Sequence, residues 1–131
     1  MSFSLTNNVL YKQLSEDFCK LFYTTFSTQG FGGIASMYAS DAVITFVEEE
    51  CTGPAAFGQK LAAMGIGSML FTDLTGTAQP HGPDTILLNV TGQTAVATNM
   101  QPAYGRFSDV FVLSRANGTW FIQHHIFKVI A

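Results

Sequence analysis

The sequence predicts an α+β fold in which N-terminal helices pack on one face of an antiparallel sheet. Helical periodicity is confined to the first half of the chain, and β-type segments fill the second half from residue 68 to residue 130. Turn signals separate these later segments. Runs of helix followed by runs of strand are typical of this class. The length of 131 residues fits one domain, 1–131, with a core large enough to need no disulfide or metal.

Three helices are expected, and the first covers residues 7–27. Its apolar residues recur at steps of three and four, as on the buried face of an amphipathic helix: Leu10, Leu14, Phe18, Leu21, Phe22 and Phe26. A short helix is expected over residues 34–38. The third helix begins at Pro54, a residue well suited to the first helical position, and runs to about residue 64.

Strands are expected from β-branched and aromatic segments between turn signals. The first covers residues 42–47, and a charged turn at residues 48–50 leads into a short returning strand at residues 51–52. The longer strands are expected at about 68–79, 84–98, 104–115 and 119–130, with a loop at residues 80–84. The Asn117-Gly118 pair predicts a two-residue hairpin turn, because both residues tolerate a positive φ.

The last strand predicts that the sheet is covered on both faces. Strict alternation divides it into two sets that are both mostly apolar: Trp120, Ile122, His124, Ile126, Lys128 and Ile130, and Phe121, Gln123, His125, Phe127 and Val129. A sheet with one solvated face should instead alternate apolar with polar residues. Charged residues make up only 11% of the chain, where about 25% is usual. A two-fold dimer packed sheet on sheet would cover the second face.

Several functional classes are not expected. The net charge is −3 and no basic patch is present, which argues against nucleic acid as a partner. The apolar runs are far shorter than the roughly 18 residues of a membrane-spanning helix, and residues 1–10 do not resemble a signal peptide. The use of cysteine, at Cys19 and Cys51, suits a reduced intracellular protein.

We expect neither a metal nor a cofactor. The two cysteines lack zinc-site spacing, and His124 and His125 point to opposite faces of a strand, so they cannot share one ion. The glycine cluster at residues 30–33 follows a helix instead of a strand, which is the wrong context for a phosphate-binding loop.

An acid–base site would have to use a small set of residues: Asp73, Asp109, His124, Tyr104 or Tyr23. A buried aspartate with a raised pKa could act as a general base. By alternation Asp109 shares a face with Phe107 and Phe111, and a carboxylate on an apolar face needs a polar partner. The other interpretation is structural, a satisfied cross-strand pair or an edge position. Both interpretations stay open at this stage.

Short stretches along the chain, taken in their order and spacing, resemble the nuclear transport factor 2 family over about residues 7–130. They are Leu21-Phe22-Tyr23, Met37-Tyr38, Val43-Ile44-Thr45-Phe46, Gly53, Ala78-Gln79-Pro80, Val90-Thr91-Gly92, Arg106-Phe107-Ser108-Asp109-Val110-Phe111 and Ile126-Phe127-Lys128. The resemblance implies a cone-like domain with a curved sheet that forms homodimers through that sheet. It also implies a carrier, not an enzyme, that takes the GDP form of the GTPase Ran into the nucleus and binds Phe-Gly repeats of nucleoporins. Such a carrier is found in the cytoplasm, the nucleus and the nuclear pore.

The resemblance also implies site residues. The cavity that would receive an aromatic side chain of the GTPase is expected to be lined by Phe46, Met64, Asn89, Val110, Ile126 and Phe127. Tyr11 is expected to bind the Phe-Gly repeats. Relatives carry acids at the cavity mouth, whereas residues 98–102 here contain none, so Glu48, Glu49 and Glu50 are expected to form the acidic rim.

Two alternatives follow from the same residues. The first is a dimeric adaptor of the same fold that binds nucleoporins or other peptides but not the GTPase. The second is an isomerase or dehydratase that uses the cone cavity, with Asp73 or Asp109 paired with His124.

Overall fold

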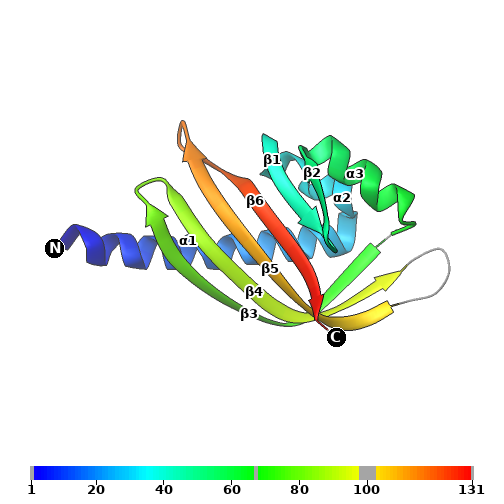
Figure 1. The fold of residues 1–131 in the computed structure, drawn as a ribbon. Helices are drawn as coiled ribbons and strands as arrows, with labels where there is room; N and C mark the ends of the chain where they lie inside the picture. The colour runs from blue at the N-terminus through cyan, green and yellow to red at the C-terminus, as the bar shows by residue number, and fades with distance from the viewer. Residues whose placement is uncertain (1, 67, 98–102, 131) are drawn as a thin grey trace.

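A computed structural model describes residues 2–66, 68–97 and 103–130 of the chain (Figure 1). The helical elements are α1 (Ser2–Gln29), α2 (Phe31–Ile34), the 3-10 turn η1 (Ala35–Met37) and α3 (Pro54–Ala63). The strands are β1 (Tyr38–Phe46), β2 (Glu49–Thr52), β3 (Ser68–Gly82), β4 (Thr85–Ala97), β5 (Ala103–Ala116) and β6 (Thr119–Ile130). The predicted α+β class is therefore confirmed. None of the helices described is both long and apolar enough to cross a membrane.

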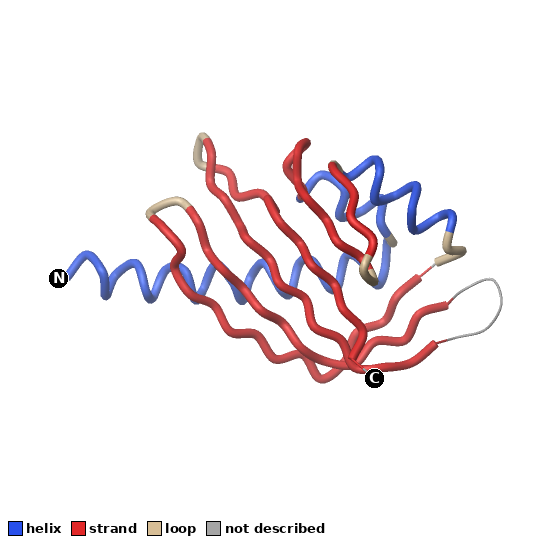
Figure 2. Tube along the Cα trace, in the orientation of Figure 1, coloured by secondary structure: helices blue, strands red, loops and turns tan. Residues whose placement is uncertain are grey.

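The six strands form one curved sheet in the order β2-β1-β6-β5-β4-β3. Helix α1 runs along one face of it, and α2 and α3 lie beside β1 and β2 (Figures 1 and 2). Every neighbouring pair is antiparallel except β1 and β6, which are parallel. The curved sheet that was expected is therefore mixed, with one parallel pair among antiparallel ones. Strand β6 reaches β1 only after β2, α3 and three further strands, so no turn signal near either strand predicts the parallel pair.

A bulge in β6 overturns the strict alternation expected for this strand. Val112 pairs with His124, but the next residue of β5, Leu113, pairs with Ile122, so Gln123 is the extra residue. A bulge of this kind shifts the strand by one residue. Ile122 therefore faces the core together with His125 and Phe127, whereas alternation would put it on the opposite face.

The core is built from aromatic rings that link the helices to the sheet. Phe22 of α1 meets Phe111 of β5 edge to face at 5.2 Å between ring centroids. Toward the other end of the sheet, Phe127 stacks on Phe46 at 4.7 Å and on Phe107 at 5.7 Å. Such offset and edge-to-face pairs add to the free energy gained from burial. Among the residues with described side chains, seven phenylalanines are buried in this core: Phe22, Phe26, Phe46, Phe57, Phe107, Phe111 and Phe127.

Two turns are shorter than the sequence predicts. Strand β2 already begins at Glu49, so Val47 and Glu48, both with positive φ, make the turn in place of residues 48–50. Strand β3 continues through residues 80–82, which were expected to be a loop, and residues 83–84 form the turn. The Asn117-Gly118 turn is confirmed, with φ of 53° and 78°.

Gly53 closes the connection into α3 and gives the first prediction. Its φ is 88°, its N–H donates to the Ala42 carbonyl at 2.7 Å, and a Cβ there would lie 2.9 Å from the Ser40 carbonyl oxygen. Gly53→Ala should lower the free energy of unfolding by about 2 kcal/mol, because the backbone conformation is strained for any other residue. Urea denaturation measures this effect.

The matched control is Gly32→Ala in α2, where a Cβ meets no atom within 4 Å. Alanine lowers the entropy of the unfolded chain and suits a helix, so this variant should be as stable as the parent or slightly more stable. Equal midpoints for the two variants would contradict the structural role given to Gly53.

Candidate functional site

A chain of four hydrogen-bonded polar side chains crosses the core. The Tyr23 hydroxyl donates to Asp109 Oδ2 at 2.6 Å, and His125 Nε2 lies 2.6 Å from Asp109 Oδ1. The Tyr38 hydroxyl lies 2.8 Å from His125 Nδ1. All four residues are at most 4% exposed. The chain therefore ties together α1, β1, β5 and β6.

The sheet register brings Asp109 and His125 together. Asp109 faces inward between Phe107 and Phe111, as the alternation predicted, and Phe111 is directly opposite His125 on β6. On one sheet face, residues diagonal across two strands are within reach of each other. Alternation predicted that Asp109 points inward, but it did not identify His125 as the partner of Asp109. Alternation alone does not tell which of two adjacent histidines points inward.

The candidate set of Asp73, Asp109 and His124 is not assembled. Asp73 is exposed at an irregularity of β3 with a φ of 54°, and His124 is exposed on the opposite face of the sheet from Asp109. Of the other residues considered for acid–base chemistry, Tyr23 belongs to the buried chain. The side chain of Tyr104 lies outside the described part of the structure.

The protonation of the two tyrosines limits the directions that the hydrogen bonds of the buried chain can take. Burial, reinforced by the nearby Asp109 carboxylate, raises the pKa of Tyr23 and of Tyr38 far above the ordinary value for a phenol. Both hydroxyls therefore keep their protons and can donate. For a neutral His125, every group is satisfied when Tyr38 donates to Nδ1 and the Nε2–H donates to Asp109. In this arrangement no buried side-chain donor or acceptor among the described residues lacks a partner.

This arrangement suits a structural role better than an acid–base role. A general base must come within hydrogen-bonding distance of the proton that it removes. Asp109 is 1% exposed, both of its oxygens already accept hydrogen bonds, and Phe111 stacks on the His125 ring at 4.3 Å. No group of three or more metal-ligating side chains occurs in the described ranges.

Two grooves lie on either side of α1. The larger, which we call the β3 groove, lies between α1 and strands β3 and β4, has a volume of about 800 Å³ and includes Tyr11, Tyr23 and Gly76 in its lining. The smaller has a volume of about 330 Å³ and is lined by Phe18, Trp120 and neighbouring residues. No motif in the sequence pointed to either groove, because each arises from residues distant in the chain.

The six residues expected to line one cavity are divided between different surfaces. Phe46 and Phe127 stack inside the core and are each 3% exposed. Asn89, Val110 and Ile126 are directly opposite one another on three adjacent strands and form a row on the outer face, away from α1. Met64 ends α3 and is 39% exposed. The expectation of a single cavity was wrong, because a resemblance in sequence order does not tell on which face each strand residue lies.

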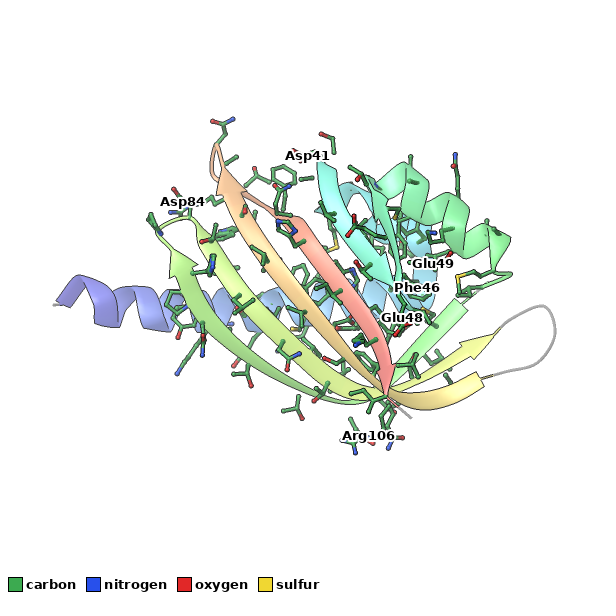
Figure 3. The ribbon with its side chains drawn as sticks, in the orientation of Figure 1. Asp41, Phe46, Glu48, Glu49, Asp84 and Arg106 are labelled. Atoms are coloured by element: carbon green, nitrogen blue, oxygen red, sulfur yellow. The ribbon has the colours of Figure 1, made fainter. Side chains whose placement is uncertain are left out.

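The three glutamates form an exposed acidic edge. Glu48 lies in the turn after β1, and Glu49 and Glu50 are the first residues of β2. Figure 3 shows Glu48 and Glu49 beside Phe46 at the end of the β1–β2 hairpin. Glu49 Oε1 is 3.7 Å from Lys60 Nζ of α3, so the charge of Glu49 is partly compensated. The segment without acids, residues 98–102, lies outside the described residues.

The buried chain gives the second prediction. Asp109→Leu should lower the free energy of unfolding by about 3–5 kcal/mol, because it leaves the Tyr23 hydroxyl and the His125 ring without an acceptor. Tyr23→Phe removes one of two donors to the carboxylate and should cost only about 1–2 kcal/mol.

Tyr11→Phe is the matched control, since it makes the same change on a half-buried tyrosine of α1 that is not one of the four hydrogen-bonded residues. It should cost about 0.5 kcal/mol or less. Guanidinium denaturation of the three variants provides the comparison, and an Asp109→Leu variant as stable as Tyr11→Phe would contradict the structural role.

Comparisons with known proteins agree with the fold and identify the family. The model of the nuclear transport factor 2 (NTF2) domain matches residues 14–129. The nuclear transport factor 2 of Neurospora crassa is 27% identical over 118 residues, covering 89% of this chain and 93% of the relative.

Two solved structures share the fold. That of nuclear transport factor 2 from Cryptosporidium parvum aligns with a TM-score of 0.75 at 24% identity, covering 91% of this chain and 94% of the other. A putative scytalone dehydratase from Novosphingobium aromaticivorans aligns with a TM-score of 0.77 at only 7% identity, covering 97% and 89%. The fold alone is thus shared with proteins described as enzymes, whereas the family model and the sequence relative agree on one assignment. On these grounds the chain belongs to the nuclear transport factor 2 domain family.

Proposed function

We propose that the protein is a nuclear import carrier for the GDP-bound form of the GTPase Ran, and that it crosses the nuclear pore by binding Phe-Gly repeats of nucleoporins. The observation that carries the proposal is the family match over residues 14–129, together with sequence relatives that are named nuclear transport factor 2. The closed hydrogen bonding of the buried chain supports a protein that binds partners on its surface and does no chemistry in its core.

The outer face of the sheet is the surface proposed for homodimer formation. Val43 of β1, Ile126 of β6 and Val110 of β5 lie on this face, and Ile126 is 43% exposed in the single chain. Apolar area of this kind is removed from water when two sheets pack face to face. Dimerisation would also cover part of the apolar surface that a chain with 11% charged residues leaves exposed.

Tyr11 is the residue proposed to bind the repeats. It is half-buried on α1, where it packs against the core and forms part of the β3 groove. An aromatic wall beside an apolar depression binds a phenylalanine ring over a small area. Small contacts dissociate quickly, which suits passage through a pore.

The acidic edge made by Glu48, Glu49 and Glu50 is proposed to attract basic groups of the GTPase. Exposed charges near an interface mainly raise the association rate and favour partners of opposite charge. These three acids would take the place of acids that the segment 98–102 does not contain.

Titration calorimetry with the GTPase tests the proposal and gives the third prediction. The protein should bind the GDP form and not the GTP form. Changing Glu48, Glu49 and Glu50 together to glutamine should weaken binding about five- to tenfold at low salt, since each exposed pair contributes about 0.2–1 kcal/mol. High salt should reduce this difference.

The control is a variant with the same change in net charge elsewhere on the surface. It combines Glu16→Gln, Asp17→Asn and Asp73→Asn. It should bind the GTPase as the parent does. Binding of Phe-Gly repeats without binding of either nucleotide form would reject the carrier function and leave the adaptor as the better assignment.

The fourth prediction concerns the repeats. Tyr11→Ala should weaken binding of a Phe-Gly repeat peptide about tenfold, because a half-buried aromatic contact surface is lost, and should leave the dimer intact. NMR titration measures the affinity and light scattering the mass. Gln13→Ala, an exposed position on the same helix, is the control. Unchanged affinity in Tyr11→Ala would exclude this residue from the repeat site.

A further inference from the structure

The β3 groove is larger than a contact with one aromatic ring requires. Its volume of about 800 Å³ lies within the range of sites that enclose small molecules, about 300–1,000 Å³. Its lining on α1 extends from Tyr11 to Thr24. At 1.5 Å per helical residue that stretch is about 20 Å long. The groove is therefore elongated, and the proposed carrier function uses only its Tyr11 end.

Small side chains on both walls keep the groove open. Ser15 and Cys19 of α1 line it from one side, and Gly76 and Ala78 of β3 line it from the other. Gly76 does not have the positive φ that would demand glycine, and a Cβ there would meet no atom closer than 3.9 Å. Glycine inside a strand weakens it and often marks a place where a ligand approaches the backbone. At Gly76 the space left by the missing side chain belongs to the groove.

The inner wall of the groove is apolar or internally satisfied. Leu88 and Val90 are each 1% exposed and form its floor. The Tyr23 hydroxyl already donates to Asp109, and the Ser15 hydroxyl donates to the Tyr11 carbonyl at 2.7 Å. Burial, with a contribution from Asp109, raises the pKa of the Cys19 thiol to about 11, so it is neutral at physiological pH. Such a wall favours an apolar ligand body.

The outer rim of the groove carries net positive charge. Lys12, Glu16 and Lys20 line it on successive turns of α1, and all three are exposed. Among the described residues, neither lysine has a carboxylate oxygen within 4.0 Å. Two ammonium groups and one carboxylate above an apolar floor complement a ligand with a single negative charge at its polar end.

We propose that the β3 groove binds a small amphipathic molecule with an elongated apolar body and one anionic group, of which a long-chain carboxylate is the simplest example. The apolar chain lies against Leu88, Val90 and Gly76, and the carboxylate lies at the rim beside Lys12 or Lys20. A phenylalanine-rich peptide is the competing occupant, and the experiment distinguishes the two.

Fluorescence titration with cis-parinaric acid, a fluorescent long-chain carboxylate, tests the proposal on the full chain. The parent protein should bind one probe per chain. Gly76→Leu fills the groove from β3 and should weaken binding at least tenfold. Cys19→Leu fills it from α1 and should act in the same direction, which guards against a misfolded single variant. Gly32→Leu makes the same change in open space and should bind as the parent does.

The anionic group is tested separately. Changing Lys12 and Lys20 together to glutamine should weaken binding of the acid about three- to fivefold at low salt. Binding of the methyl ester of the same probe should not change. Arg106→Gln together with Lys128→Gln, two exposed positions on the outer face of the sheet, removes the same two charges and is the control for net charge.

Three results would overturn the proposal. One is the absence of saturable binding to the parent, and another is unchanged binding in both folded groove-filling variants. The third is complete displacement of the probe by a Phe-Gly repeat peptide in the Tyr11→Ala variant as well as in the parent, which would assign the whole groove to the peptide. Loss of GTPase binding alone would contradict the carrier function and leave the groove proposal standing.

Discussion

The structure depends on the burial of one carboxylate. Asp109 sits among phenylalanines at 1% exposure, and a charge in such a place must be compensated. Its two oxygens accept hydrogen bonds from Tyr23 of α1 and His125 of β6, and Tyr38 extends the chain to β1. Elements from the two ends of the chain, α1 and β1 on one side and β5 and β6 on the other, therefore have one arrangement that satisfies every donor. That arrangement fixes the position of α1 over the sheet, and with it the grooves on both sides of the helix.

The same constraint keeps Asp109 from binding a substrate, because both of its oxygens already accept hydrogen bonds from buried partners. At the surface, the described residues form the outer face of the sheet, the acidic edge at Glu48–Glu50 and the two grooves beside α1. Three of the nine acids of the sequence, Glu48, Glu49 and Glu50, are exposed together at one edge of the molecule.

Local chemistry predicted most of the fold. The Asn117-Gly118 turn, the start of α3 at Pro54 and the burial of Phe22 and Phe26 each follow from residues close together in the chain. Leu21, which was expected on the same buried face of α1, is instead 59% exposed. The errors arose where distant segments decide the outcome. The bulge at Gln123 depends on pairing with β5, and the parallel β1–β6 pair depends on the whole path of the chain.

The candidate site was less predictable for the same reason. An inward Asp109 follows from its spacing between Phe107 and Phe111, but its partner is set by the register of β6. Sequence order also placed Phe46 and Ile126 in one cavity, whereas the alternation of strands puts them on opposite sides of the sheet.

In the closed form of the buried chain the Tyr38 hydroxyl donates to Nδ1 of His125 and the Nε2–H donates to Asp109. Long-range proton–nitrogen correlation spectra of protein labelled with ¹⁵N-histidine report directly which ring nitrogen carries the proton. At neutral pH we expect His125 to be protonated at Nε2, with an unprotonated Nδ1 that accepts a hydrogen bond. A proton on Nδ1 and none on Nε2 would leave Tyr38 without an acceptor and Asp109 without its second donor, and would show that the buried chain is not closed in this way.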